Sequence, residues 1–245
     1  MRTTKRITLI GDVHGRIDEY LKLIQDCENS IQLGDMGFDY SRLLDIDANR
    51  HRFLPGNHEQ YARLFQLACK GWNVPFGAAG KEGLNPNGVP CGHGSAQLAD
   101  IELFYIRGGY SIDKNMRVTG RDWFPEEEMA YDELRYLSWR FESAMTRVAP
   151  EKRPELIVSH ECPAFLVSDY DDLRKGDIWK HFCQSYQPSR TALAMEEAWK
   201  SVETKPPIWV FGHHHVAMDE VIEGTRFICL AELETLELEF STTTH

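Results

Sequence analysis

The sequence predicts an α/β fold in which helices pack against a largely central β-sheet. Short apolar runs rich in β-branched residues recur along the chain, as expected of strands that are buried on both faces. Between these runs, apolar residues recur every three or four positions, a spacing that indicates amphipathic helices. Strands that alternate with helices in this way are typical of layered α/β domains.

Five apolar runs, taken in chain order, are predicted as strands that end in a polar cluster. They are Ile7–Ile10, Ile31–Leu33, Arg52–Leu54, Leu156–Val158 and Ile208–Phe211. Ile101–Ile106 is predicted as a further strand. The alternation of apolar residues between Phe227 and Phe240 predicts final antiparallel strands.

Helices are predicted over Ile17–Cys27 and His58–Lys70. A third helix is predicted over Asp122–Phe141, because Pro125 and the three glutamates after it suit a helix N-terminus. We expect a single domain over residues 1–245, with loop-rich insertions near 71–98 and 168–189. Most of the first insertion, residues 71–95, holds seven glycines and three prolines and is predicted as an irregular loop or lid.

Composition narrows the classes of protein to consider. Of the 245 residues, 42% are hydrophobic, which is enough for a core, and no run approaches the roughly 18–20 apolar residues of a membrane span. The net charge of -11 and the scattered Lys and Arg argue against stable nucleic-acid binding. The apolar run near the N-terminus is too short for a secretory signal, and the cysteines form no CxxC pair. We therefore expect a cytoplasmic protein with no membrane partner, and its oligomeric state stays open.

Asp, Asn and His residues recur where the predicted strands end. Each one alone has a structural explanation, as a turn residue, a cap or a core histidine. In open α/β sheets, however, functional sites lie beyond the carboxyl ends of the strands. The candidate metal ligands at these ends are Asp12, His14, Asp35, Asn57, His160, His213 and His215.

The residue types favour a pair of divalent metal ions. Asp12 and His14 are two positions apart and can face one ion, and His213 and His215 repeat that spacing. The carboxylate of Asp35 has two oxygens and can bridge two ions. Because the set contains only two carboxylates, two bound dications would leave the site positive and attractive to a phosphate ester. Mixed oxygen and imidazole ligands favour Mn, with Fe, Zn or Ni as alternatives, over Mg or Ca.

Five motifs follow one another along the chain: GDVHG (Gly11–Gly15), GD (Gly34-Asp35), GNHE (Gly56–Glu59), SH (Ser159-His160) and GHHH (Gly212–His215). As an ordered set they resemble the calcineurin-like metallophosphoesterase superfamily. The resemblance implies a four-layer α/β/β/α sandwich of two mixed β-sheets flanked by helices. It also implies a phosphomonoesterase or phosphodiesterase, in which a metal-bound hydroxide attacks the phosphorus in line with the leaving group.

The resemblance also implies a role for each motif residue. The first ion would be bound by Asp12, His14 and His215, the second by Asn57, His160 and His213, and Asp35 would bridge them. His58, the histidine of GNHE, would be the catalytic residue that contacts the substrate. It would stabilise charge on the phosphoryl oxygens or protonate the leaving alkoxide.

Two positions depart from the protein serine/threonine phosphatase and dinucleoside tetraphosphatase branch of this superfamily. Phe38 stands where that branch has an Asp that supports the catalytic histidine, and Pro55 stands where it has a phosphate-binding Arg. Asp39, one residue late, is a candidate substitute for that Asp. A phosphoprotein phosphatase is therefore disfavoured.

Residues 105–117 and 123–129 resemble stretches of small bacterial and phage-encoded members of the superfamily. Within and near them, Arg107 and Arg117 are candidate substrate-binding residues, and solvated surface charge is the alternative for each. The expected substrate is a small phosphate ester or a nucleotide. A nuclease of the same superfamily and a non-catalytic, partner-binding scaffold remain as alternatives. Because the chain keeps every ligand position and His58, the enzyme is favoured over the scaffold.

Overall fold

The computed structural model describes residues 2–69, 92–169, 173 and 188–243. The strands are β1 (Arg2–Ile10), β2 (Ser30–Gln32), β3 (His51–Phe53), β4 (His93–Leu98), β5 (Ile101–Ile106), β6 (Leu156–Ser159), β7 (Ile208–Phe211), β8 (Met218–Ile222), β9 (Thr225–Cys229) and β10 (Thr235–Thr243). The α-helices are α1 (Ile17–Gln25), α2 (Tyr61–Cys69), α3 (Tyr131–Arg135), α4 (Leu137–Thr146), α5 (Ala164–Asp169) and α7 (Arg190–Lys200). No helix among these residues is long and apolar enough to cross a membrane.

The strands form two mixed sheets. One has four strands in the order β10-β1-β2-β3, in which β1 runs antiparallel to β10 and parallel to β2. The other has six strands in the order β4-β5-β6-β7-β9-β8, in which β5, β6, β7 and β9 are parallel. The predicted antiparallel strands near the C-terminus are confirmed, since β8 pairs with β9 and β10 pairs with β1 in that sense.

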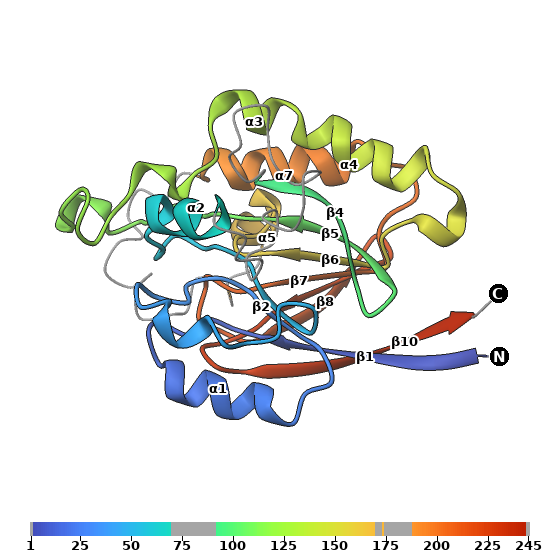
Figure 1. Cartoon of the computed structure of the whole chain (residues 1–245). Helices are drawn as coiled ribbons and strands as arrows, with labels where there is room; N and C mark the ends of the chain where they lie inside the picture. Colours follow the sequence, from blue (N-terminus) through green and yellow to red (C-terminus); the bar gives the residue numbers. More distant parts are fainter. Residues whose placement is uncertain (1, 70–91, 170–172, 174–187, 244–245) are drawn as a thin grey trace.

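The sequence alternation along each strand explains how the layers assemble. In β1, Ile7 and Leu9 face the other sheet, whereas Ile10 faces the cluster that contains Tyr20 of α1. In β5, Tyr105 faces the core between the sheets, and its neighbours on the chain face the helices. Helix α1 covers the four-stranded sheet, and α3, α4 and α7 cover the six-stranded sheet (Figure 1). The predicted four-layer sandwich is therefore confirmed.

Two predicted elements differ from the structure. The single helix predicted over 122–141 is wrong in its start and in its continuity, because Pro125–Glu127 forms a short 3-10 turn and the helical residues divide into α3 (Tyr131–Arg135) and α4 (Leu137–Thr146). The side chain of Glu127 is buried, so this segment packs inward and does not form an exposed first helical turn. His93–Leu98, which falls within the predicted insertion 71–98, is strand β4 and pairs with β5. Residues 71–91 of that insertion, and most of 168–189, lie outside the described residues.

Candidate metal centre

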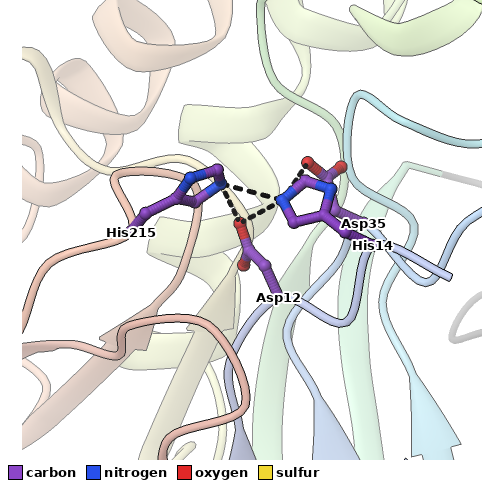
Figure 2. A group of neighbouring side chains, drawn as sticks. All are labelled: Asp12, His14, Asp35 and His215. Atoms are coloured by element: carbon purple, nitrogen blue, oxygen red, sulfur yellow. Dashed lines mark hydrogen bonds and ion pairs between the residues drawn. The ribbon is translucent and has the colours of Figure 1, made fainter. Parts of the chain in front are cut away.

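The loops that follow five strands bring the predicted metal ligands together. Asp12 and His14 follow β1, Asp35 follows β2 and Asn57 follows β3, while His160 follows β6 and His213 and His215 follow β7. Ligand atoms of Asp12, His14, Asp35 and His215 all lie within 4.8 Å of one another (Figure 2). Because these residues come from both sheets, the cluster lies where the strand ends of the two sheets meet.

The ligand atoms of Asp12, His14, Asp35 and His215, the first group, lie close to one another. The Nε2 atom of His215 lies 3.1 Å from Oδ2 of Asp12 and 2.9 Å from Nε2 of His14. The Nε2 atom of His14 lies 3.8 Å from Oδ2 of Asp12 and also 3.8 Å from Oδ2 of Asp35. Both carboxylates are fully buried. Two buried carboxylates and two half-buried imidazoles that converge on one point are a donor set that fits a metal ion.

The second group is built around His160. Its Nδ1 atom lies 2.8 Å from the backbone oxygen of Leu33, and because a carbonyl oxygen only accepts, Nδ1 carries the ring proton. In the neutral ring, the lone pair of Nε2 then faces Oδ1 of Asn57 at 2.8 Å and Oδ1 of Asp35 at 3.3 Å. Three acceptor atoms that face one another fit a cation between them. The ring of His213 completes the group, 4.9 Å from the ring of His160 between centroids.

Four of the predicted ligands have a backbone conformation that favours glycine. The φ angle is 49° at His14, 57° at Asp35, 68° at His213 and 55° at His215. Each such residue costs on the order of 1–3 kcal/mol, and strain of this kind clusters at functional sites. Among the described residues, four of the eight non-glycine residues with positive φ are therefore predicted ligands.

Glycine is required at two positions that touch the ligands. Gly34 has a φ of 117°, and a Cβ atom there would overlap the ring of His160. A Cβ atom at Gly56 would overlap both the Asp35 carboxylate and the His160 ring. These two motif glycines let the loops after β2 and β3 approach His160 closely.

Asp35 is the electrostatic centre of the cluster. Burial alone would raise the pKa of its carboxyl group, but the surrounding histidines hold this pKa below its usual range; they are His160, His58, His14 and His213. Its Oδ1 atom also accepts a hydrogen bond from the backbone N–H of His58 at 2.7 Å. The carboxylate is therefore ionised and lies between the two ligand groups, as a bridging ligand must.

His58 faces a cleft beside this cluster, with an arginine against its ring. The cleft is lined by Asp35, Asn57, His58, Tyr110, Ser111, Ile112, Asp113, Arg117, His213, His214 and His215. The Nη1 and Nη2 atoms of Arg117 lie 2.8 Å and 2.7 Å from Nδ1 and Nε2 of His58, and Nη2 donates to Asp113 at 2.7 Å. Burial lowers the pKa of His58, so its ring is neutral near pH 7.

Two carboxylates lie near His58. The Oδ2 atom of Asp35 is 3.9 Å from Nε2 of the ring, and Asp113 is connected to the ring through Arg117. The candidate Asp39 contacts Ser41 instead. Asp39 is exposed and accepts hydrogen bonds from the backbone N–H and the hydroxyl of Ser41, at 3.0 Å and 2.7 Å. Asp113 reaches His58 through Arg117, four residues further along the chain. Arg117, within the segment 105–117, was predicted from the sequence as a candidate substrate-binding residue. The sequence did not predict that Arg117 contacts His58.

The structure places Arg107 away from the cleft. The side chain is buried, with Nη1 donating to the backbone oxygen of Glu126 at 3.0 Å and Nη2 lying 3.4 Å from Glu133. Its guanidinium also lies over the ring of Tyr61, 4.9 Å from the centroid. These contacts tie the loop after β5 to α2 and α3, and they do not support the prediction that Arg107 holds the substrate.

Sequence reasoning missed two carboxylates that support the ligands. Glu59 accepts hydrogen bonds from the backbone N–H groups of Met36 and Gly56, both at 2.6 Å, and so ties the Asp35 loop to the Asn57 loop. Its place at the end of GNHE could have identified it. Glu232 lies 3.4 Å from Nδ1 of His215, and no motif near it marks this role.

The model of the calcineurin-like phosphoesterase family matches residues 5–217, a span that contains every predicted ligand. The chain belongs to this family. Membership in the family, together with the cluster of Asp12, His14, Asp35 and His215, supports a metal-binding phosphoester hydrolase. No curated protein matches the sequence.

Solved structures resemble the chain at low identity. A hypothetical protein from Thermus thermophilus is 14% identical and has a TM-score of 0.45, with 93% of this chain and 76% of that chain covered. A putative 5'-nucleotidase from Staphylococcus aureus is 14% identical and has a TM-score of 0.48. The match covers 98% of this chain but only 51% of that chain, so this chain spans about half the length of that protein. Phosphopantetheinyl hydrolase from Mycobacterium tuberculosis is 14% identical and has a TM-score of 0.42, with 92% of this chain and 89% of that chain covered. At these scores the activities of the three proteins do not transfer to this chain.

Proposed function

We propose that this chain hydrolyses phosphate esters at a site that holds two divalent metal ions. The observation that carries the proposal is the convergence of buried and half-buried Asp, Asn and His side chains from both sheets around Asp35. The proposed ligands are Asp12, His14 and His215 for the first ion, Asn57, His160 and His213 for the second, and Asp35 as the bridge. The mixture of oxygen and imidazole donors favours manganese, with iron, zinc or nickel as alternatives.

Such ions, when bound, neutralise charge on phosphoryl oxygens and lower the pKa of a bound water to about 7. The protein's own part is to fix the orientation of the ligands. Asp35 is held by the backbone N–H of His58, and His160 is held by the carbonyl of Leu33. These two contacts fix the ligand orientations before any ion binds.

His58 is the proposed catalytic residue. Its backbone is fixed to Asp35, while its side chain faces the cleft. A neutral imidazole beside the phosphoryl group can donate a hydrogen bond to a phosphoryl oxygen. The protonated form of the ring, which is the minor form near pH 7 because burial lowers the pKa of His58, can deliver a proton to the leaving oxygen as the ester bond breaks.

Arg117 is the proposed binding residue for the phosphoryl group. Among the described residues that line the cleft it is the only Lys or Arg, and its contact with Asp113 fixes the direction of its guanidinium. A guanidinium binds two oxygens of one phosphate group. The proposed substrate is a small phosphate ester, which includes nucleotides.

The test is a set of parallel assays on a nitrophenyl phosphomonoester, its bis-ester, a dinucleotide and short nucleic acids. We expect hydrolysis of a small ester that requires added Mn²⁺ and is abolished by a chelator. Activity that survives the chelator would contradict the metal site. Cleavage of nucleic acid alone would favour the nuclease, and a metal-loaded protein that is inert toward the whole panel would favour the scaffold.

A further inference from the structure

A chain of buried hydrogen bonds leads from Asn57 away from the metal cluster. The Nδ2 atom of Asn57 donates to Oγ of Ser111 at 3.0 Å. That hydroxyl donates to Oε2 of Glu127 at 2.6 Å, and the backbone N–H of Ser111 donates to Oε1 at 2.9 Å. The exposed fractions of Asn57, Ser111 and Glu127 are 4%, 1% and 1%. These bonds are therefore largely shielded from water, although Asn57 and Ser111 also line the cleft.

The chemistry of Glu127 determines the direction of every bond in this chain. Burial raises the pKa of Glu127, while the two hydrogen bonds from Ser111 lower it. In its ionised form the carboxylate only accepts, so the single proton of the Ser111 hydroxyl then points to Glu127. The lone pairs of that hydroxyl are then left for Asn57, whose NH₂ group is the end that can donate. The amide of Asn57 is therefore oriented with Nδ2 toward Ser111 and Oδ1 toward His160, 2.8 Å away.

This orientation matters because the two ends of an asparagine amide have nearly the same shape and opposite chemistry. The oxygen end binds a metal ion, whereas the NH₂ end has no lone pair to offer and would repel a cation. Packing alone does not distinguish the two orientations. A fixed hydrogen-bond partner behind the amide does.

We propose that Ser111 and Glu127 are positioning residues that hold Asn57 with its oxygen toward the second metal ion. The inference rests on the proposed function, since it assumes that Asn57 binds that ion. A backbone hydrogen bond also holds Glu127 in place. The N–H of Gly109 donates to the backbone oxygen of Glu127 at 3.1 Å, which fixes the 3-10 turn Pro125–Glu127 against the loop after β5.

Two substitutions separate this role from simple packing. Ser111→Ala removes the hydroxyl and leaves the amide of Asn57 without its partner. Glu127→Gln keeps the shape of the side chain and exchanges donor and acceptor in the hydrogen bonds from residue 127 through Ser111 to Asn57. The new amide accepts from the backbone of Ser111 and donates to its hydroxyl, so the hydroxyl proton turns to Asn57 and draws Oδ1 away from the ion.

The reversal gives a further test, because an aspartate at position 57 has oxygens at both ends. In an Asn57→Asp background, the redirected hydroxyl proton satisfies one oxygen and leaves the other for the ion. Glu127→Gln should therefore weaken binding of the second ion in the wild-type background and should not weaken it in the Asn57→Asp background. Damage to packing would act equally in both backgrounds.

The measurement is a Mn²⁺ titration of each purified full-length variant by calorimetry, with paramagnetic resonance to detect the coupled ion pair. We expect two ions per wild-type chain. Ser111→Ala and Glu127→Gln should weaken the second ion by about 10-fold to 100-fold and leave the first unchanged. The matched control is Ser30→Ala, which deletes a buried hydroxyl that lies 2.9 Å from His51 Nδ1 at the amino ends of β2 and β3; it should leave both affinities unchanged.

The outcomes distinguish the inference from the proposed function. Two ions in the wild type with unchanged second-ion affinity in Glu127→Gln would overturn the positioning role alone. A loss of equal size in the wild-type and Asn57→Asp backgrounds would also overturn it. A wild-type chain that binds no second ion would overturn the proposed function and the positioning role with it.

Discussion

At the scale of single residues, the cluster depends on positions where the backbone tolerates only certain side chains. His14, Asp35, His213 and His215 all have positive φ angles, and Gly34 lies against His160 with no room for a side chain. The free energy lost to this strain must be recovered elsewhere in the fold. The binding of metal ions at the cluster would recover part of this free energy.

Gly34→Ala should lower the free energy of unfolding by about 2–3 kcal/mol, because it combines an unfavourable φ with an overlap against His160. The matched control is Gly224→Ala, where φ is 86° and no atom lies within 4 Å of the added Cβ. The control should cost only about 1 kcal/mol. Urea unfolding measures both values, and equal losses would contradict the close approach at Gly34.

His58→Ala should reduce kcat by about 10²–10⁴-fold and leave the metal content unchanged, because the side chain contributes proton transfer and is not a ligand. The measurements are turnover of a small phosphate ester and metal analysis of the same sample. His51→Ala is the control, since that histidine contacts Ser30 at the amino ends of the strands. Parallel loss of metal and turnover in His58→Ala would refute the catalytic role.

At the scale of elements, the site depends on keeping adjacent strand-end loops in register. Glu59 does this for the loops after β2 and β3, because one carboxylate accepts both backbone N–H groups. Asp35 lies in the first loop and Asn57 in the second. Their separation, and so the fit of a bridged ion pair, is set by this buried side chain.

Glu59→Gln should lower the free energy of unfolding by about 1–3 kcal/mol and weaken metal binding, because the new NH₂ group faces a backbone N–H that needs an acceptor. The control is Glu237→Gln on β10, where the side chain is half-exposed near Arg6. Urea unfolding and a Mn²⁺ titration measure the two effects. A Glu59→Gln protein that matches the control in both would contradict the coupling of the loops.

Local patterns predicted the elements that carry the ligands and failed where distant contacts decide the structure. Apolar runs followed by Gly-Asp or Gly-Asn-His are short-range signals, and the strands behind them end within one residue of their predicted ends, although β1 begins five residues earlier than predicted. Strand β4 has the weak strand sequence HGSAQL, and its structure follows from pairing with β5. The residues 122–130 carry helix-start signals, yet burial of Glu127 against Ser111 gives them another conformation.

At the scale of the whole molecule, the two sheets position one cluster that neither could build alone. The four-stranded sheet provides Asp12, His14, Asp35 and Asn57, and the six-stranded sheet provides the remaining histidines. The ordered motifs were enough to predict this convergence. The supporting residues Ser111, Glu127 and Glu232 could not be predicted, because each lies far along the chain from the ligand it supports.

The most direct measurement is anomalous diffraction at the manganese edge from a crystal of the protein soaked in Mn²⁺. Two peaks about 3.5–4 Å apart are predicted, with the Asp35 carboxylate between them and His58 bound to neither. A single peak, or two peaks that do not share Asp35, would contradict the two-ion site.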